Sequence, residues 1–232
     1  MYEVRFYQGD YNDRQAKANE DQCIAYVEHH FNSSSNAEAG YSMVVTGANA
    51  SQTSINWGRW YAGAISRGLD VSLGGDRGVV VGGYNGLGDY NLRYTDMPAV
   101  LLEPLFASNP WHATRIRDEN SQAQLAGILS ESIQRFFPQG GVVGFSVGHK
   151  YKESNPNDRG ASVYGGGTEA DYAEIVLNKA KILLESVSEV QTKREVRVLQ
   201  GADLLWTHTI DADTSVTWDP VLGVLQLGSI NG

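Results

Sequence analysis

The sequence has a single cysteine, Cys23, so no disulfide can form within the chain. The cysteine content therefore does not indicate whether the protein works in an oxidising or a reducing compartment. Basic residues are also in short supply: 18 Lys and Arg stand against 27 Asp and Glu, which gives a formal net charge of -9. A protein that binds nucleic acid through phosphate contacts needs a clustered basic surface, and this composition does not supply one. We therefore expect no nucleic-acid partner.

Long hydrophobic runs are absent as well. No stretch reaches the ~20 apolar residues that a membrane-spanning helix needs, and the first ten residues, MYEVRFYQGD, lack the apolar segment of a signal peptide. With 41% hydrophobic residues among 232, the chain is long enough for one sizeable core and an appendage. The sequence thus predicts a globular protein with no membrane span and no visible leader.

Short apolar strands alternate with amphipathic helices over most of the chain, which is typical of α/β proteins with a twisted, mostly parallel sheet. Strands are predicted at residues 2–7, 24–27, 97–103 and 142–147, and helices at 10–19, 57–68, 120–137 and 168–184. Gly68 is the expected C-cap of the second helix. From residue 193 the pattern changes to short strands separated by turn residues. We expect an α/β domain over residues 1–192 and a small all-β appendage over 193–232.

Polar side chains gather where three of the predicted strands end. They are His29 and His30 after one strand, Glu103 at the end of another, and His149 after the third. In open α/β sheets, ligands bind at this edge. Adjacent residues on a strand point to opposite faces, so only one of His29 and His30 can serve a site while the strand stays regular.

Two histidines and a glutamate, with a second glutamate beside them, fit a catalytic zinc site, which takes three protein ligands and a water whose pKa falls to about 7. Glu169 stands in the first turn of a helix that Thr168 caps, whereas Glu174 lies a turn deeper and is the alternative ligand. Glu103 closes a buried strand and must be paired, bound to metal or protonated. The spacing matches no local motif such as His-Glu-x-x-His, so the residue pattern alone does not establish a metal site.

Several other polar residues have simpler interpretations. We expect His112 to lie in a surface loop and His208 to be structural. Glu28 is expected to be either solvated or a supporting group of the site, and Asp158 either orients a ligand or caps a turn.

Three segments carry a resemblance to a known family. The segment NDRQAKANEDQCIAYVEHHFNS has an arginine and an Ala-Asn pair in a helix, followed by a strand that ends in His-x-Asn. MPAVLLEPLFASNP has a Pro-Ala-Val strand, a glutamate and a trailing Phe-x-x-Asn, and FSVGHKYKESNPNDRGASVYGGGTEADYAEIVLNKAKILLE has a Gly-His strand end, an Asp-x-Gly-Ala loop and a helix-starting glutamate. Over residues 2–190 the chain resembles zinc-dependent N-acetylmuramoyl-L-alanine amidases.

The resemblance implies that His149, Glu169 and His30 bind one zinc ion, with His30 preferred over His29 because it stands in the His-x-Asn frame with Asn32. It implies that Glu103 is the general base and then the general acid. The expected fold is a phosphorylase/hydrolase-like sheet flanked by helices, and the expected substrate is peptidoglycan, cleaved between N-acetylmuramic acid and L-alanine. Such an enzyme acts on the bacterial cell wall, outside the cell, in the periplasm or as a phage-borne endolysin.

The order of the segments differs from that of the family. The Gly-His strand comes first in the family and last here, so the chain resembles a circular permutant cut between the first helix and the second strand; a sheet tolerates such a cut in an exposed loop. Lys150 and Tyr151 replace the glycines that follow the family's histidine, and the loop from His149 to Glu169 is longer. These departures put the fit of the substrate in doubt more than metal binding.

Two other functions remain open at this point. One is a zinc carboxypeptidase-like amide hydrolase, and the other is a catalytically inactive wall-binding or virion structural module. The appendage at 193–232 is expected to bind the cell wall, to mediate self-association or to attach the protein to a larger particle, and its residues do not decide among these.

Overall fold

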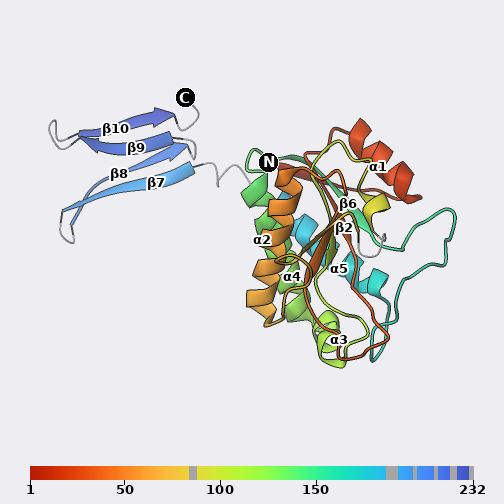
Figure 1. Cartoon of the computed structure of the whole chain (residues 1–232). Helices are drawn as coiled ribbons and strands as arrows, with labels where there is room; N and C mark the ends of the chain where they lie inside the picture. Colours follow the sequence, from red (N-terminus) through yellow and green to blue (C-terminus); the bar gives the residue numbers. More distant parts are fainter. Residues whose placement is uncertain (84–87, 187–192, 201–202, 212–213, 220–223, 230–232) are drawn as a thin grey trace. The chain divides into compact units, whose positions relative to one another are not determined.

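The computed structural model describes residues 1–83, 88–186, 193–200, 203–211, 214–219 and 224–229 (Figure 1). The chain forms two compact units, one of Tyr2–Ser186 and one that takes in Met1 and Val187–Gly232. Thr192, where the sequence predicts a domain boundary, lies outside the described residues.

The larger unit is built on one mixed sheet of six strands in the order β1-β6-β2-β5-β3-β4. The strands are β1 Tyr2–Phe6, β2 Ala25–His29, β3 Met43–Thr46, β4 Val79–Val81, β5 Ala99–Glu103 and β6 Gly141–Val147. All neighbours pair in parallel except β3 and β5, which are antiparallel. The prediction of a mostly parallel α/β sheet is confirmed.

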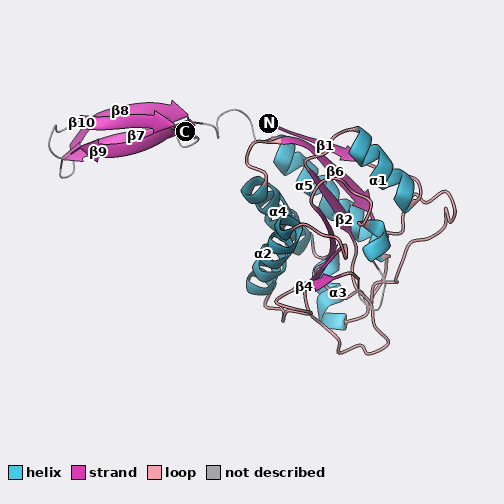
Figure 2. Ribbon diagram, turned by 45° about the horizontal axis from the view of Figure 1, so that its top comes forward, coloured by secondary structure: helices cyan, strands magenta, loops and turns pink. Residues whose placement is uncertain are grey.

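Helices cover both faces of this sheet (Figure 2). They are α1 Tyr11–Glu20, α2 Gln52–Leu69, the 3-10 helix η1 Asp89–Asn91, α3 Pro110–Arg117, α4 Glu119–Phe136 and α5 Glu169–Glu185. Helix α5 packs on β1, β6 and β2, helix α2 packs on β3, β4 and β5, and α4 contacts both helices. Helix α1 lies on the opposite face, against η1. Among the described helices, none combines the length and the apolar composition that a membrane span requires.

The sheet is buried most completely at its centre. Strand β2 lies between β6 and β5, and all five of its residues are buried. On the α1 side of the sheet, Tyr26, Ala99 and Leu101 form a cluster with Ala18 of α1. Burial on both faces explains the nearly continuous apolar runs of β5 and β6.

The end of helix α2 differs from its prediction. Gly68 is not the C-cap: the helix continues through Leu69, and Asp70 takes the left-handed conformation, with φ 53°. Aspartate tolerates this region better than most residues, because its short polar side chain can bond locally. The start of α5 is as predicted, since the Thr168 side chain accepts a hydrogen bond from the Asp171 N–H and caps the helix at Glu169.

The smaller unit contains two antiparallel strand pairs. Strand β7, Lys193–Gln200, pairs with β8, Asp203–Asp211, and β9, Thr214–Asp219, pairs with β10, Val224–Ser229. The register of the first pair shifts between Val198 and Leu199.

Candidate metal and catalytic site

Three of the predicted site residues converge on one point. One ligand atom each from His30, His149 and Glu169 lies within 4.8 Å of the other two. Oε1 of Glu169 is 3.2 Å from Nδ1 of His30 and 3.1 Å from Nε2 of His149. The two imidazole rings meet edge to face, with centroids 4.9 Å apart.

The register of the central strands explains this convergence. His29 is level with Val147 of β6 and with Leu102 of β5. Backbone pairing continues one residue further, because the His30 N–H donates to the Leu102 carbonyl (2.9 Å) and the Gly148 N–H donates to the His29 carbonyl (2.9 Å). His30 and His149, which follow β2 and β6, and Glu103, the last residue of β5, therefore lie at the carboxyl edge of the sheet.

Strand alternation separates the two adjacent histidines. His30 lies on the same face as Tyr26 and Glu28, whereas His29 lies on the opposite face, where its ring centroid is 5.0 Å from that of Phe31. His29 is fully buried, and neither of its nitrogens has a hydrogen-bond partner in the described part of the chain. Burial lowers the pKa of His29 to about 3, so its ring is neutral at ordinary pH. His29 is also not part of the cluster of possible metal ligands.

Two glycines give the cluster its space. A Cβ on Gly148 would overlap Cε1 of His30, and a Cβ on Gly160 would overlap the carboxyl carbon of Glu169. Both approaches would be under 3.0 Å, which real Cβ atoms essentially never show. His149 itself has φ 63°, an unusual conformation for a residue other than glycine, and such strain is concentrated at functional sites.

A second carboxylate faces the far nitrogen of each clustered histidine. Nε2 of His30 is 2.7 Å from Oε1 of Glu28, and Nδ1 of His149 is 3.0 Å from Oδ2 of Asp158. Each carboxylate can accept the proton of that nitrogen, which leaves the lone pair of the other nitrogen available to a metal ion. Metal-binding histidines have this arrangement. Asp158 thus contacts a candidate ligand and also accepts the Gly160 N–H (2.9 Å), so the structure contains the contacts of both roles expected for it.

Glu28 is not a solvated residue, contrary to one of the two expectations. It is fully buried, and its carboxylate accepts hydrogen bonds from Asn91 Nδ2 (2.6 Å) and from the Ser146 hydroxyl (3.3 Å) as well as facing His30. The sequence signal for this contact is the spacing of Glu28 and His30, since residues two apart on a strand share a face.

The donor atoms fit a zinc ion. Two imidazole nitrogens and one carboxylate oxygen are a common donor set for catalytic zinc, and donors about 2.1 Å from a tetrahedral ion are about 3.4 Å apart. The distances of 3.1 and 3.2 Å to Oε1 of Glu169 come close to this spacing.

The charged groups of the cluster act on one another. Burial disfavours the charged form of His30, but hydrogen bonds to Glu169 and Glu28 outweigh it and raise the pKa of His30 to about 10. Burial also disfavours the charged form of Glu169, yet its hydrogen bonds to His149 and His30 lower its pKa to about 2. Positive charge on the imidazoles therefore stabilises the negative carboxylate of Glu169. A cation between these atoms would supply the same positive charge.

Glu103 has the properties of a proton-transfer group. Its Oε2 atom is excluded from solvent and has no hydrogen-bond partner among the described residues. Burial raises the pKa of Glu103 to about 8, and the charges of His30, Glu169 and His149 also act on it. A carboxyl group with a pKa near the working pH suits general acid–base chemistry.

Arg14 of α1 holds the strand end that precedes His149. This fully buried guanidinium donates to the Ser146 hydroxyl (2.7 Å), to the Val147 carbonyl (2.8 Å) and to the Gly9 carbonyl (2.7 Å). Its contacts fix the end of β6 against α1, and through Ser146 they reach Glu28 and His30.

The structure also places three other residues that the sequence singles out. The prediction for His112 is wrong: it lies not in a surface loop but buried in helix α3, where Nδ1 accepts a hydrogen bond from the Phe106 N–H (3.0 Å). Glu174, the alternative ligand, lies outside the cluster and faces Lys150 Nζ (2.7 Å) and the Tyr151 hydroxyl. His208 is in strand β8.

Comparison with known families gives one match. Residues 3–135 match the family model of N-acetylmuramoyl-L-alanine amidase. This region contains His30 and Glu103 and ends before β6 and α5, which carry His149 and Glu169. None of the curated proteins matches the sequence.

Solved structures give further matches. The catalytic domain of CwlV, an N-acetylmuramoyl-L-alanine amidase from Bacillus (Paenibacillus) polymyxa var. colistinus, is 25% identical with a TM-score of 0.47, over 56% of this chain and 66% of that one. An N-acetylmuramoyl-L-alanine amidase from Clostridium difficile 630 is also 25% identical, over the same shares, with a TM-score of 0.48. Ami1 from Mycobacterium smegmatis is 15% identical, over 56% of this chain and 61% of that one, with a TM-score of 0.49. The chain thus covers slightly less than two thirds of the length of each of these structures.

Proposed function

The chain belongs to the N-acetylmuramoyl-L-alanine amidase family, whose model matches more than half of it, and from this premise we propose that it hydrolyses peptidoglycan at the amide bond between N-acetylmuramic acid and L-alanine. The observation that carries the proposal is the convergence of His30, His149 and Glu169 at the sheet edge where Glu103 also ends its strand. The cluster geometry and the family match support the same chemistry.

We propose that His30, His149 and Glu169 hold one zinc ion. When bound, zinc would polarise the scissile carbonyl and lower the pKa of water to about 7. Glu28 and Asp158 would keep the two imidazoles in the tautomer that presents a lone pair to the ion. Gly148 and Gly160 would keep the ion's surroundings free of side-chain bulk.

Glu103 would move the proton. Positive charge at the ligand cluster lowers the pKa of Glu103, as His30 already does, so that its carboxylate can take a proton from the attacking water. As the carbon–nitrogen bond breaks, the same carboxyl group would give that proton to the departing amine. The products are a lactyl carboxylate on the glycan and a stem peptide with a free L-alanine amino group.

We also propose that the chain is a circular permutant of the family's domain. The family match ends before the strand and helix that carry His149 and Glu169, yet β6 lies in the sheet between β1 and β2. The end of α5 lies against β1, because the Val4 N–H donates to Glu185 Oε1 (3.0 Å) and Lys181 Nζ donates to the Val4 carbonyl (2.7 Å). A short link there would place β6 and α5 ahead of β1, with every contact of the unit kept.

Digestion of purified peptidoglycan tests the activity. We expect new amino-terminal L-alanine, with full loss of turnover in Glu103→Gln. A zinc carboxypeptidase-like hydrolase would release other amino groups instead. A protein that contains no zinc, and stays inert when zinc is added, would be the inactive wall-binding or virion module.

The proposed site of action is the bacterial cell wall, reached outside the cell, in the periplasm or from a phage particle. For residues 193–232, binding to the wall, self-association and attachment to a particle stay predictions.

A further inference from the structure

A groove of about 520 Å³ lies beside the loop that follows His149. Its polar lining consists of Gln8, Lys17, Tyr151, Lys152, Glu153 and Arg159. Three of these side chains are cationic and one is acidic, although the chain as a whole carries a formal charge of -9. The groove is therefore a local basic site on an acidic protein.

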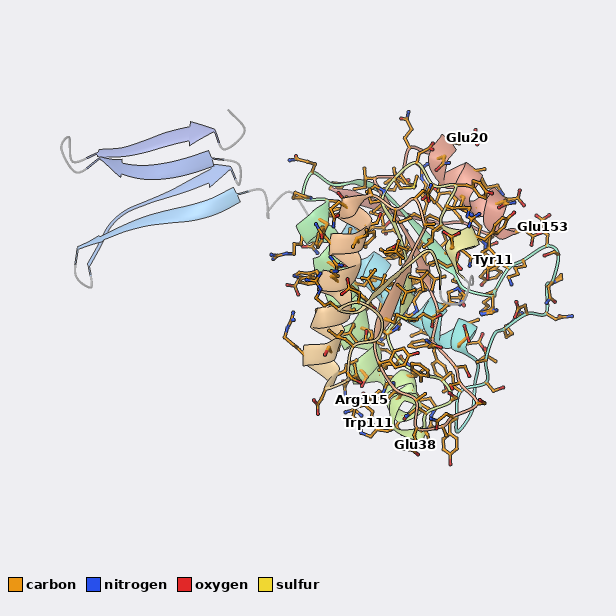
Figure 3. The ribbon with its side chains drawn as sticks, viewed as in Figure 1. Tyr11, Glu20, Glu38, Trp111, Arg115 and Glu153 are labelled. Atoms are coloured by element: carbon orange, nitrogen blue, oxygen red, sulfur yellow. The ribbon has the colours of Figure 1, made fainter. Side chains whose placement is uncertain are left out.

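Two contacts connect this groove to the candidate metal site. Lys152 Nζ donates to Oδ2 of Asp158 (2.7 Å), the same oxygen that lies 3.0 Å from His149 Nδ1. Lys152 Nζ also lies 4.7 Å from the ring centroid of Tyr11, whose hydroxyl accepts the His149 N–H (3.3 Å). Figure 3 shows Tyr11 and Glu153 on the same side of the domain, away from Trp111 and Arg115.

Two of the three cations make no close ion pair, although the charge of Arg159 acts on Asp171 over a longer distance. Within residues 1–83 and 88–186, neither Lys17 nor Arg159 makes an ion pair, and Arg159 Nη1 donates only to the backbone carbonyls of Pro156 and Asp158. Neighbouring Lys150, by contrast, is neutralised by Asp171 and Glu174. Glu153 also lines the groove without an ion pair among the described residues, so the two unpaired cations exceed the unpaired acid by one charge, and a bound anion would be stabilised there.

We propose that this groove binds a carboxylate of the stem peptide and so selects substrates whose peptide is acidic close to the cleaved bond. This inference rests on the proposed amidase function, because the stem peptide begins at that bond and carries free carboxylates further along. The link through Asp158 places Lys152 next to His149, and Lys17 and Arg159 line the same groove, so it lies beside the loop that the reacting amide would face. Lys17 and Arg159 supply the charge, and Lys152 connects the groove to His149 through their shared contact with Asp158.

The test compares two soluble muramoyl peptides that differ in one group, a free carboxylate in one and its carboxamide in the other. With the wild-type protein we expect a KM several-fold lower for the carboxylate form and a similar kcat for both. Exposed ion pairs change affinity by about two- to five-fold each. Lys17→Gln should therefore reduce the preference by about that factor, and Lys17→Glu should abolish it.

Lys179→Gln is the matched control, because Lys179 lies in α5, outside the groove, and makes no ion pair in the described part of the chain. It removes the same charge and should leave the preference unchanged. Equal KM values for the two peptides in the wild type, or a Lys17→Glu protein with the wild-type preference, would overturn the proposal. A preference that falls equally in Lys179→Gln would also overturn it, because net charge alone would then explain the effect.

Calorimetric titration separates this proposal from the activity itself. If the wild-type protein cleaves neither peptide, the amidase function fails, and titration of both peptides into the protein still tests the groove. Tighter binding of the carboxylate form, weakened by Lys17→Gln, would support a carboxylate site. Equal binding of both forms, with competition by a wall phosphate polymer only, would assign the groove to phosphate and overturn the proposal.

Discussion

Glu28 and His30 stand two residues apart on β2, and Oε1 of Glu28 lies 2.7 Å from Nε2 of His30. Because side chains alternate across a strand, this spacing places both on the face toward α1. Asn91 and Ser146 also donate to the Glu28 carboxylate, so it is fixed before any ligand binds. Glu28 is therefore positioned to decide which nitrogen of His30 faces Glu169.

We predict that Glu28→Gln weakens zinc binding about 10- to 100-fold, the usual cost of losing the outer partner of a ligand histidine. A neutral amide accepts the Nε2 proton less strongly, and the other nitrogen of His30 becomes less basic. Competition with a chromophoric chelator measures the affinity. Glu153→Gln is the control, since Glu153 is exposed; equal affinities in the two variants would contradict the prediction.

The ligand and proton-transfer roles should separate in two variants. We expect His30→Ala to lose zinc, because it removes one of three converging donors. Glu103→Gln should keep stoichiometric zinc and lose turnover, since the amide cannot carry a proton between water and amine. Metal analysis and peptidoglycan digestion of both proteins check this pair. A Glu103→Gln protein without zinc would make Glu103 a ligand instead.

His29→Leu should retain zinc and should be slightly more stable than the wild type. His29 is buried on the opposite face from His30, with both nitrogens unpartnered in the described part of the chain. An unsatisfied buried polar group costs about 1–3 kcal/mol, and leucine has a similar volume without polar atoms. Urea unfolding and metal analysis test this. Loss of zinc would show that the assignment of His30 over His29 is wrong.

Acid should destabilise the fold partly through His112. Burial, and then the charge of Arg115, lower the pKa of His112 to about 4, whereas the unfolded chain has the ordinary value near 6.5. The unfolded state therefore binds more protons between these values, and stability is lost as the pH falls from 6.5 toward 4. The loss from this one residue would be on the order of 3 kcal/mol by linkage.

His112→Asn isolates that contribution. Its side-chain oxygen can still accept the Phe106 N–H, but it does not titrate. The difference in unfolding free energy between wild type and variant should change between pH 7 and pH 4, in the direction that favours the variant in acid. A difference that is constant with pH would mean that His112 has the same pKa in both states.

The strand ends could be predicted from the sequence because they combine two strong signals. Apolar runs mark β2, β5 and β6, and the polar residues that follow them must lie at one edge if the strands are parallel. Strand β4 could not be found, since its three valines stand among glycines that adopt positive φ. Strand β3 is a short apolar run inside a polar stretch, and only its pairing with β5 and β4 defines it.

The residues that contact the candidate ligands and their carboxylate partners were harder to predict from the sequence. Asn91 contacts Glu28 although the two residues are 63 positions apart in the sequence, and Ser146 contacts it from 118 positions away. His112 comes just after Asn109, in a segment that the sequence places in a surface loop, but the turn after β5 folds back and buries it against Phe106. Contacts of this kind depend on tertiary packing, which no local pattern encodes.

The tight approach of Gly148 to His30 gives a steric test of the site. A methyl group on Gly148 would overlap Cε1 of His30, so Gly148→Ala must displace the ring or the loop. We expect zinc affinity to fall while the fold survives, because the clash is confined to the sheet edge. Gly127→Ala is the control: it lies in α4, a Cβ there meets nothing within 4 Å, and alanine should stabilise the helix by about 1 kcal/mol. Zinc binding by Gly148→Ala with wild-type affinity would show that His30 does not need its present position to hold the ion, and the three-ligand assignment would lose its geometric basis.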